Sequence, residues 1–483
     1  MKNQPLPSKI PSDDDRSGRY TIAIALVACL GGLMFGYDIG VIADAKIGLK
    51  NEFKFGDLAI ESVVSAVLAG SFIGAIVAGT LCDRIGRRKS NIWGGVLFAI
   101  GCLGCSFSDG FISIVAFRIV MGMGVGFSSV AGPLYIAEVA APWSRGGMVS
   151  LYQLAITVGI LLAFVAGIPL GYLAEDYGWR VAFGAGSLLG AALIFGMMVM
   201  PSSPRWLVAQ GRLDEAKGVL ARTMGSKAVA EKELEAIRLR QVSEAAEGLW
   251  NALKTRPAVR VALILAVGLA FLQQASGINA IFYYAPEIFQ KIGLGDDESR
   301  KYLVAGLGLV NVLATFIAIF LVDRVGRRPL LLVGTALMMV AEIGVAVTGT
   351  AIAADPSSMS TPGLMVVLGL VISIVAFAFS LGPLVWLVIA EIFPASVRSQ
   401  CVGVATSMNW IGNFLIAQGA LTAVKFSPSL AFGIFAFFNA ITFCFVYWRM
   451  PETKGVELEQ IQAFFEGGGS RKGRTSEASS GRG

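Results

Sequence analysis

The sequence predicts an all-α membrane protein of twelve transmembrane helices in two six-helix bundles, and three observations carry this prediction. Of its 483 residues, 55% are hydrophobic and only 15% are charged. Apolar runs of about twenty residues recur along most of the chain, each long enough to cross a hydrocarbon core of about 30 Å. Two charged motifs also occur once in each half, in the same order. A membrane β-barrel would show short alternating segments instead.

The apolar runs form two sets of six, separated by one long polar segment. We place the spans at 20–42, 60–82, 90–107, 112–139, 148–171, 180–199, 258–288, 302–322, 329–353, 363–389, 398–421 and 427–448. The predicted organisation is an N-terminal tail (1–19), a first bundle (20–199), a linker of short amphipathic helices on the membrane face (200–257), a second bundle (258–448) and a C-terminal tail (449–483).

The distribution of Lys and Arg predicts the orientation in the membrane. The loops at 83–90 and 323–330 and the linker are rich in these residues, whereas the loops on the other side carry mixed or acidic charge. Since cytoplasmic loops carry an excess of Lys and Arg, we expect both termini on the cytoplasmic side of the cell membrane, inner or plasma. The same rule accounts for the net charge of +6, so it indicates no nucleic-acid partner.

The repeated motifs indicate two bundles of like topology. Asp83-Arg84-Ile85-Gly86-Arg87-Arg88 recurs as Asp323-Arg324-Val325-Gly326-Arg327-Arg328, and Ala137-Glu138 with Arg145 recurs as Ala390-Glu391 with Arg398. Such bundles rock about a central site. Because an Arg fork pairs well with carboxylates, we interpret each set as an ion-pair latch that holds the cytoplasmic side closed. The alternative is charge that only sets the topology.

The first span contains a carboxylate, Asp38, at a depth where a charge costs roughly 2.5–3.5 kcal/mol. Gly32, Gly36 and Gly40 form a close-packing face, and helical geometry points Asp38 away from it, on about the same side as Phe35. The carboxylate is therefore expected to face a transport path.

Arg118 in the fourth span is the predicted partner of Asp38. The pair is either a static structural element or a proton-coupling site, in which loosening of the pair lets desolvation favour protonation of Asp38. The chain contains no His, which excludes a histidine relay.

Amide side chains at lipid depth indicate either hydrogen bonds between helices or a site for a polyhydroxylated ligand. Gln273, Gln274 and Asn279 lie in the seventh span, where Gly277 loosens the helix. The other polar candidates are Gln153 in the fifth span, Asn311 in the eighth, and Asn409 and Asn413 in the eleventh. In the tenth, Gly382-Pro383 is predicted to break the helix before Trp386, a side chain suited to the C–H face of a sugar.

The chain resembles the sugar porters of the major facilitator superfamily. The resemblance rests on GGLMFGYD (31–38), DRIGRR (83–88), RIVMGMGVG (118–126), YIAEVAAPWSRG (135–146), SSPRWL (202–207), QQASGINAIFYYAPEIF (273–289), DRVGRR (323–328), GPLVWLVIAEIFP (382–394), NWIGNF (409–414) and PETKG (451–455). The combination in 273–289 together with PETKG is the most specific part.

The resemblance implies the major facilitator fold and a set of site residues. It implies a sugar pocket of Phe35, Gln153, Ile160, Gln273, Gln274, Asn279, Tyr283, Asn311, Phe377, Gly382, Trp386, Asn409 and Trp410, with Tyr283 and Tyr284 as the extracellular gate. It implies proton coupling through Asp38 and Arg118. With Arg205 of the SSPRWL stretch added, the latch comprises Asp83, Arg84, Arg87, Arg88, Glu138, Arg145, Arg205, Asp323, Arg324, Arg327, Arg328, Glu391 and Arg398.

Two details refine this picture. Ile160 stands where xylose-symporter relatives carry a second Gln, which favours a hexose such as glucose. Ser202 stands where the family motif usually has Glu, which weakens the latch.

The leading hypothesis is import of a monosaccharide with a proton by alternating access. The rivals are a passive sugar facilitator and a sugar sensor without turnover. The sequence shows no nucleophile–base set and no phosphate loop, so it does not indicate an enzyme. The six cysteines suggest packing residues, not a metal site. We expect a functional monomer in the lipid bilayer, with no cofactor and the proton as co-transported ion.

Overall fold

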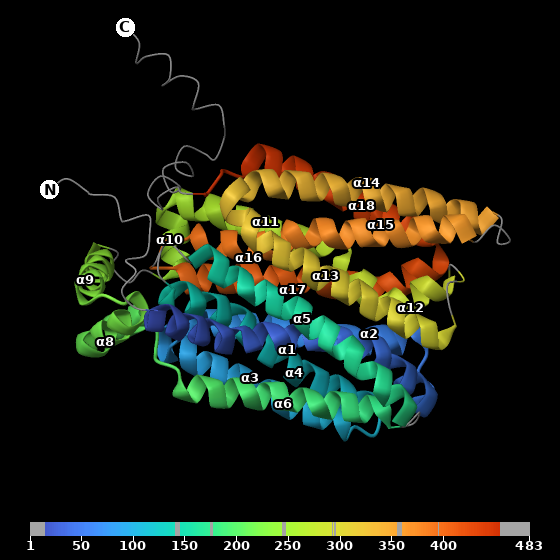
Figure 1. Cartoon of the computed structure of the whole chain (residues 1–483), viewed down its shortest axis with the longest axis horizontal. Coiled ribbons are helices and arrows are strands. Elements are labelled where there is room, and N and C mark those ends of the chain that lie inside the picture. The colour runs from blue at the N-terminus through green and yellow to red at the C-terminus, as the bar shows by residue number, and fades with distance from the viewer. Residues whose placement is uncertain are drawn as a thin grey trace, which may run out of the picture.

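The computed structural model describes residues 15–140, 145–173, 177–243, 248–291, 293, 296–354, 360–394 and 396–454. In these ranges the chain forms eighteen helices and no strand. The long helices run side by side along the longest axis of the molecule (Figure 1). Most of the two predicted tails, 1–14 and 455–483, lies outside the described residues.

Six long helices make up the first half of the chain. They are α1 (Asp15–Phe53), α2 (Asp57–Ile85), α3 (Arg87–Ser106), α4 (Phe111–Val139), α5 (Arg145–Leu173) and α6 (Gly178–Val199). The glycine face of α1 packs directly on α5: a Cβ on Gly36 would lie 1.8 Å from the carbonyl oxygen of Ile156, and one on Gly40 would lie 2.5 Å from Cβ of Ala163. This close approach confirms the packing face predicted from the glycine spacing.

The second half contains eight helices, because two predicted spans are broken. They are α11 (Pro257–Ala275), α12 (Ile278–Lys291), α13 (Asp297–Val325), α14 (Arg327–Ala354), α15 (Ser360–Phe379), α16 (Leu381–Glu391), α17 (Arg398–Phe426) and α18 (Pro428–Arg449). The seventh span breaks at Gly277, whose positive φ of 81° suits glycine.

The predicted break at Gly382-Pro383 is wrong by a few residues. The tenth span is interrupted at Ser380, and Gly382 and Pro383 lie in the first turn of α16. Proline is tolerated there because the amides of a first helical turn have no intrahelical acceptor.

The described chain holds twelve long helical segments, counting α11 with α12 and α15 with α16 as one segment each. Ten of them are long and apolar enough by themselves to cross a membrane. The other two are α3 and α17. Their hydropathy is lowered by the basic start of α3 at Arg87 and Arg88 and by amides of α17 such as Asn409 and Asn413.

The polar segment between the halves forms four short helices. They are α7 (Pro204–Ala209), α8 (Leu213–Met224), α9 (Lys227–Ser243) and α10 (Leu249–Thr255). The first three of these helices, α7, α8 and α9, share a small core that includes Leu207, Leu220 and Ile237. Lys217 and Glu231 link α8 to α9 at 2.6 Å, and this charged hydrogen bond holds the pKa of Glu231 below its usual range.

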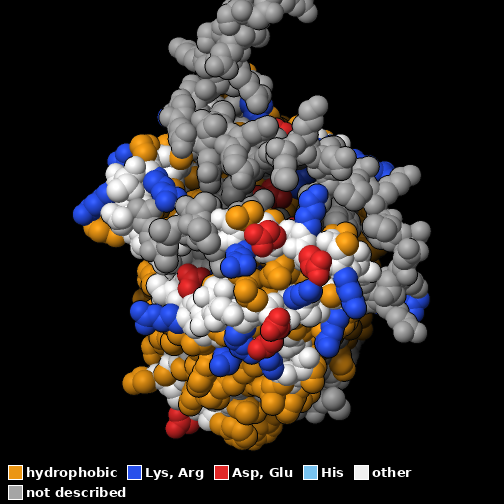
Figure 2. Space-filling view, turned by 90° about the vertical axis from the view of Figure 1, so that its left-hand side faces the viewer, with side chains coloured by type: hydrophobic (Ala, Val, Ile, Leu, Met, Phe, Trp, Pro, Cys, Tyr) orange, Lys and Arg blue, Asp and Glu red, His pale blue; other side chains and the backbone are white. Residues whose placement is uncertain are grey.

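We call the end of the molecule that carries α8, α9 and α10 the linker end, and the opposite end the far end (Figure 1). Charged side chains gather on the linker end (Figure 2). The two halves meet along α2 and α17 and along α5 and α13. Near the linker end the contact is backbone to backbone, because a Cβ on Gly79 would lie 3.0 Å from Cα of Gly403.

Candidate functional site

A small cavity lies between the two halves, about midway along the helices that form it. The predicted residues that line it are Phe35, Gln153, Ile160, Gln273, Gln274, Asn279, Asn311, Phe377 and Trp386. They come from α1, α5, α11, α12, α13, α15 and α16. Both halves of the chain therefore contribute to the cavity wall.

The room inside this cavity is about 20 Å³. That is enough for a water molecule and far too little for a sugar ring. The structure is thus a closed conformation, in which the walls have to separate before a ligand of that size can enter.

Amides of the second half are connected to one another along the cavity wall. Asn279 Nδ2 donates to Gln274 Oε1 at 2.6 Å, and Gln274 Nε2 donates to Asn409 Oδ1 at 3.0 Å. Asn409 Nδ2 then donates to Gln273 Oε1 at 2.6 Å. The chain ends where Gln273 Nε2 donates to the carbonyl of Leu381 at the start of α16, at 2.7 Å. These amides satisfy one another in the closed state, so hydrogen bonds between helices are one of their functions.

One acceptor in the cavity wall has no protein partner. Oδ1 of Asn311 is buried without a hydrogen bond. Because a buried carbonyl oxygen without a donor is costly, this atom is available to a water or a hydroxyl group in the cavity.

Four predicted pocket residues lie next to the cavity without lining it. Asn409 hydrogen-bonds to both Gln273 and Gln274 but does not line the cavity itself. Trp410 packs edge-on against Phe35 with ring centroids 4.7 Å apart, and its Nε1 donates to Ser129 of the other half at 3.3 Å. Gly382 lies against Phe377 and Gln153, and the hydroxyl of Tyr283 accepts from Asn413 at 3.3 Å.

Sequence reasoning missed four apolar residues of the cavity wall. They are Ile39, Ile156, Ile278 and Phe282. Three of them stand three or four residues from a predicted pocket residue on the same helix, namely from Phe35, Gln153 and Asn279. Helical periodicity was therefore a signal that could have found them.

The predicted pairing of Asp38 with Arg118 is present in the structure. Arg118 of α4 donates to the Asp38 carboxylate, and both side chains are buried. Arg118 also donates from Nε to the carbonyl of Val63 at 3.1 Å and from its second amino group to that of Val64 at 3.3 Å. The guanidinium thus has backbone acceptors on α2 in addition to the carboxylate.

Asp38 does not share the orientation of Phe35 as closely as expected. Phe35 lines the cavity, whereas Asp38 is turned towards α4 and is absent from the cavity wall. The reason is that Arg118 stands on α4 within the same half, and the ion pair draws the carboxylate in that direction.

The first of the two arginine clusters joins α2, α3, α4 and α7 at the linker end. We call Asp83, Arg87, Glu138 and Ser203 the first-half cluster. Arg87 Nε lies 3.0 Å from Glu138, and its Nη2 lies 3.1 Å from Asp83. Ser203 donates to Glu138 at 2.5 Å. Arg87 also donates to Ser399 of the other half at 2.8 Å, so this cluster bridges the halves.

The second cluster repeats this arrangement at the start of α14, with residues of the PETKG stretch in the place of Ser203. We call Arg327, Glu391, Glu452 and Thr453 the second-half cluster. Arg327 lies 3.3 Å from Glu391, and Thr453 donates to Glu391 at 3.2 Å. Glu452 accepts from the backbone amides of Arg327 and Arg328, both at 3.0 Å. The function of Glu452 had not been predicted, although PETKG had been noted as a motif.

The other predicted latch residues are not all part of these clusters. Arg88 donates from Nε to the carbonyl of Met197 at the end of α6, and Arg398 donates to the carbonyl of Phe393. Arg84 and Arg324 are exposed. Arg205 lies in α7 beside the first-half cluster and is half-buried. The side chains of Arg145 and Asp323 lie outside the described residues.

The predicted gate residues, Tyr283 and Tyr284, stand in α12 on the far side of the cavity. Both are buried, and the Tyr284 hydroxyl donates to the carbonyl of Ala417 at 2.8 Å. Tyr284 departs from helical geometry (φ −123°, ψ 18°), which divides α12 at this point.

Two helical halves around a small cavity lined by amides and aromatic rings define a membrane transporter of the major facilitator fold. The "Sugar (and other) transporter" family model matches residues 24–465, so the chain belongs to this family. It is an integral membrane protein of the plasma membrane and a transporter, not an enzyme.

Individual relatives are similar over almost the whole chain. The galactose-proton symporter of Escherichia coli (strain K12) is 36% identical over 92% of this chain and 94% of its own length. The arabinose-proton symporter of the same strain is 35% identical over 92% and 93%. Among solved structures, a proton:xylose symporter bound to 6-bromo-6-deoxy-D-glucose matches with a TM-score of 0.81 at 28% identity, over 92% of this chain and 99% of that one.

Proposed function

We propose that this protein imports a monosaccharide together with a proton by alternating access of the two halves. The observation that carries the proposal is an amide-lined cavity between the halves in the same molecule as a buried Asp38–Arg118 pair. The similarity to galactose-, arabinose- and xylose-proton symporters supports the same substrate class.

The amides and the aromatic rings suit a sugar. Gln153, Gln273 and Asn279 offer donors and acceptors for hydroxyl groups, and Trp386 offers an apolar face for C–H groups. Asn311 adds its unpartnered acceptor. Because the amides hydrogen-bond to one another when the cavity is closed, a sugar replaces existing contacts and leaves no buried group unpaired.

Asp38 and Arg118 are proposed to couple the proton to the sugar. While Arg118 donates to Asp38, the carboxylate is stabilised as an ion. Val63 and Val64 already accept from Arg118, so the guanidinium keeps acceptors if α1 and α4 shift within the first half and the pair loosens. An unpaired carboxylate at this depth is costly, and taking up a proton removes the cost.

In more detail, we propose that the substrate is a hexose such as glucose and that the protein functions as a monomer without a cofactor. Both termini and the linker end are proposed to lie in the cytoplasm. Ile160 lines the cavity at the position that favoured a hexose. The proposed units are the tails 1–19 and 449–483, the bundles 20–199 and 258–448 and the linker 200–257. A competition panel of glucose, galactose, fructose, arabinose, xylose and inositol against labelled glucose tests the substrate.

Uptake into proteoliposomes with and without an inward proton gradient tests the coupling. We expect the gradient to accelerate sugar accumulation by the wild type and to have no such effect on Asp38→Asn, which should still exchange sugar at equal concentrations. If the gradient changes uptake by neither protein, the interpretation as a passive facilitator is favoured. Absence of exchange in the wild type would favour the sensor.

Glu342→Gln is a matched control for Asp38→Asn. Glu342 is another fully buried carboxyl group, held in the second half by Asn439 at 2.7 Å and Ser373 at 3.1 Å. It lies outside the cavity wall and outside the proposed coupling pair. Gradient-driven uptake is expected to survive this substitution, so loss of coupling in both variants would contradict a specific function of Asp38.

A further inference from the structure

Lys46 is a buried lysine that the proposed transport mechanism does not yet use. It lies in α1, two helical turns beyond Asp38 towards the far end, and is only 1% exposed. A cation buried in a membrane protein is costly without partners and is by default a candidate functional group.

The Lys46 ammonium contacts α12 of the other half. Its Nζ donates to Glu287 Oε2 at 2.6 Å and to the backbone carbonyl of Tyr283 at 2.6 Å. It also lies 4.8 Å from the ring centroid of Tyr284, within range of a cation–π contact. One lysine of the first half thus contacts three residues of α12, and we call this stretch of α12, residues 282–287, the gate segment.

The segment that Lys46 holds is an interrupted helix. Gly277 separates α12 from α11, and Tyr284 divides α12 itself. Pro286 has no N–H to donate to the carbonyl of Phe282. With fewer hydrogen bonds of its own, this stretch can be repositioned by an external contact. Phe282 lines the central cavity, so a movement here changes the cavity wall.

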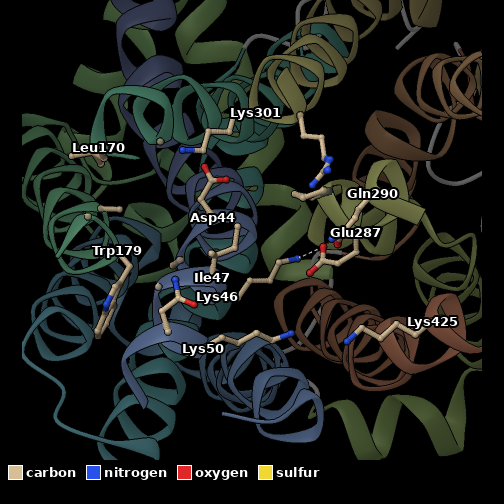
Figure 3. A pocket seen from close by; sticks show the side chains of 18 residues that line it. Asp44, Lys46, Ile47, Lys50, Leu170, Trp179, Glu287, Gln290, Lys301 and Lys425 are labelled. Carbon is tan, nitrogen blue, oxygen red and sulfur yellow. Dashed lines mark hydrogen bonds and ion pairs between the residues drawn. The ribbon is translucent and has the colours of Figure 1, made fainter. Parts of the chain in front are cut away.

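A second, larger cavity of about 600 Å³ lies next to Lys46 and Glu287 at the far end, and we call it the outer vestibule (Figure 3). Asp44, Lys46, Lys50, Glu287 and Lys301 are among its lining residues. Figure 3 shows Lys46 extending from α1 towards Glu287, with Asp44 and Lys301 facing each other nearby. Lys46 and Glu287 therefore stand between the outer vestibule and the gate tyrosines.

We propose that Lys46 and Glu287 form an outer latch, which closes the gate segment of α12 against α1 and breaks when the central cavity opens to the outer vestibule. Lys46 is a positioning residue: it acts on Phe282, Tyr283 and Tyr284 and does not touch the substrate. The proposal rests on alternating access as set out under the proposed function, and it adds a charged contact at the far end to the arginine clusters at the linker end.

Distance measurements between two spin labels test the outer latch without any sugar. Tyr177 at the start of α6 and Tyr302 in α13 are exposed, 64% and 53%, on opposite halves at the far end. With both replaced by labelled cysteines in the full chain, Lys46→Met should shift the distance distribution to longer values. Lys46→Arg should keep the distribution of the parent, and the exchange Lys46→Glu with Glu287→Lys should restore it in part.

Lys50→Met is the matched control. Lys50 lines the same vestibule one turn further along α1, but its partner Asp57, at 2.9 Å, belongs to the same half. Asp57 keeps its own contact with Lys425 of the other half, at 2.6 Å, when Lys50 is replaced. We expect the distribution for Lys50→Met to equal that of the parent. The unsubstituted chain, treated with the label, checks that its native cysteines, five of them buried, do not react.

Two outcomes would overturn the outer latch. One is an unchanged distribution for Lys46→Met. The other applies if Lys46→Met does not fold. The test is then made with Glu287→Gln, because the Glu287 side chain is 18% exposed and its replacement disturbs the fold less. An unchanged distance distribution for Glu287→Gln would count against the latch. Sugar exchange is measured separately, so a distance shift in a protein that exchanges no sugar would retain the latch and reject the proposed function.

Discussion

The first-half and second-half clusters come from the same repeated motif, but they differ in what covers the motif. In both, an arginine at the start of a helix pairs with a glutamate, and a hydroxyl group donates to that glutamate: Ser203 to Glu138 and Thr453 to Glu391. Pro201-Ser202-Ser203 and Pro451-Glu452-Thr453 thus occupy corresponding places. Ser202 corresponds to Glu452, so at this position only the second-half cluster has a carboxylate.

The consequence of this difference is visible at the two motif glycines. Glu452 lies against Gly326 and accepts from the first amides of α14. Against Gly86 lies the ring of Trp206, and α3 has no side-chain cap. A charge stabilises one helix start, whereas an aromatic ring covers the other. The repeat has kept the ion pair and changed its surroundings.

The largest expected effect separates the two ion pairs by burial. Glu138→Gln removes the more deeply buried of the two carboxylates that pair with Arg87, since the Glu138 side chain is 4% exposed and that of Asp83 is 40% exposed, so we expect the free energy of unfolding to fall by roughly 3 kcal/mol. Glu391 is 22% exposed, and Glu391→Gln should cost only about 1 kcal/mol. Denaturant unfolding of the purified variants measures both. Equal losses would mean that burial does not distinguish the clusters.

The next effect concerns the helix start in the second-half cluster. Glu452→Gln keeps the size of the side chain and removes its charge at the N-terminus of α14, which should lower the free energy of unfolding by about 1 kcal/mol. Glu235→Gln, at an exposed site on α9, is the control and should leave the midpoint of denaturation unchanged. If the two variants behave alike, Glu452 does not stabilise α14.

The smallest effect is a gain in the first-half cluster. Ser202→Glu places a carboxylate at the position that corresponds to Glu452, near the uncapped start of α3, and should raise the free energy of unfolding by about 0.5 kcal/mol. Ser202→Gln, of similar size without the charge, should give no gain. A shift in melting temperature for the Glu variant alone would support the correspondence, and a loss of stability would count against it.

Prediction from the sequence worked best where charge or close packing demanded a partner. Asp38 and Arg118 are both too costly to stand alone in a membrane, and the structure pairs them. The spacing of Gly32, Gly36 and Gly40 predicted a packed face because only small residues let two backbones approach. The loops DRIGRR and DRVGRR predicted their glutamates because the motifs recur together.

Prediction was weaker where one helix boundary or one contact between the halves decided the outcome. The first span was expected to end at 42, four residues before Lys46, whereas α1 continues to Phe53. The break in the tenth span was assigned to Gly382-Pro383, but Pro383 is accommodated in a first helical turn. Which amide donates to which along Gln273, Gln274 and Asn409 also depends on side-chain rotamers, for which the sequence has no signal.

By itself, the sequence determined that this is a membrane protein of two like bundles with Asp38 and Arg118 charged at lipid depth, because hydropathy, glycine spacing and intramembrane charge are local properties of the chain. The family resemblance added the transport function. The tertiary structure alone decided that Asp38 turns away from the cavity, that Glu452 caps α14, and that Lys46 reaches Glu287 across the two halves. Lys46 and Glu287 are 241 residues apart in sequence. Contacts between such distant segments arise only when the two halves pack together.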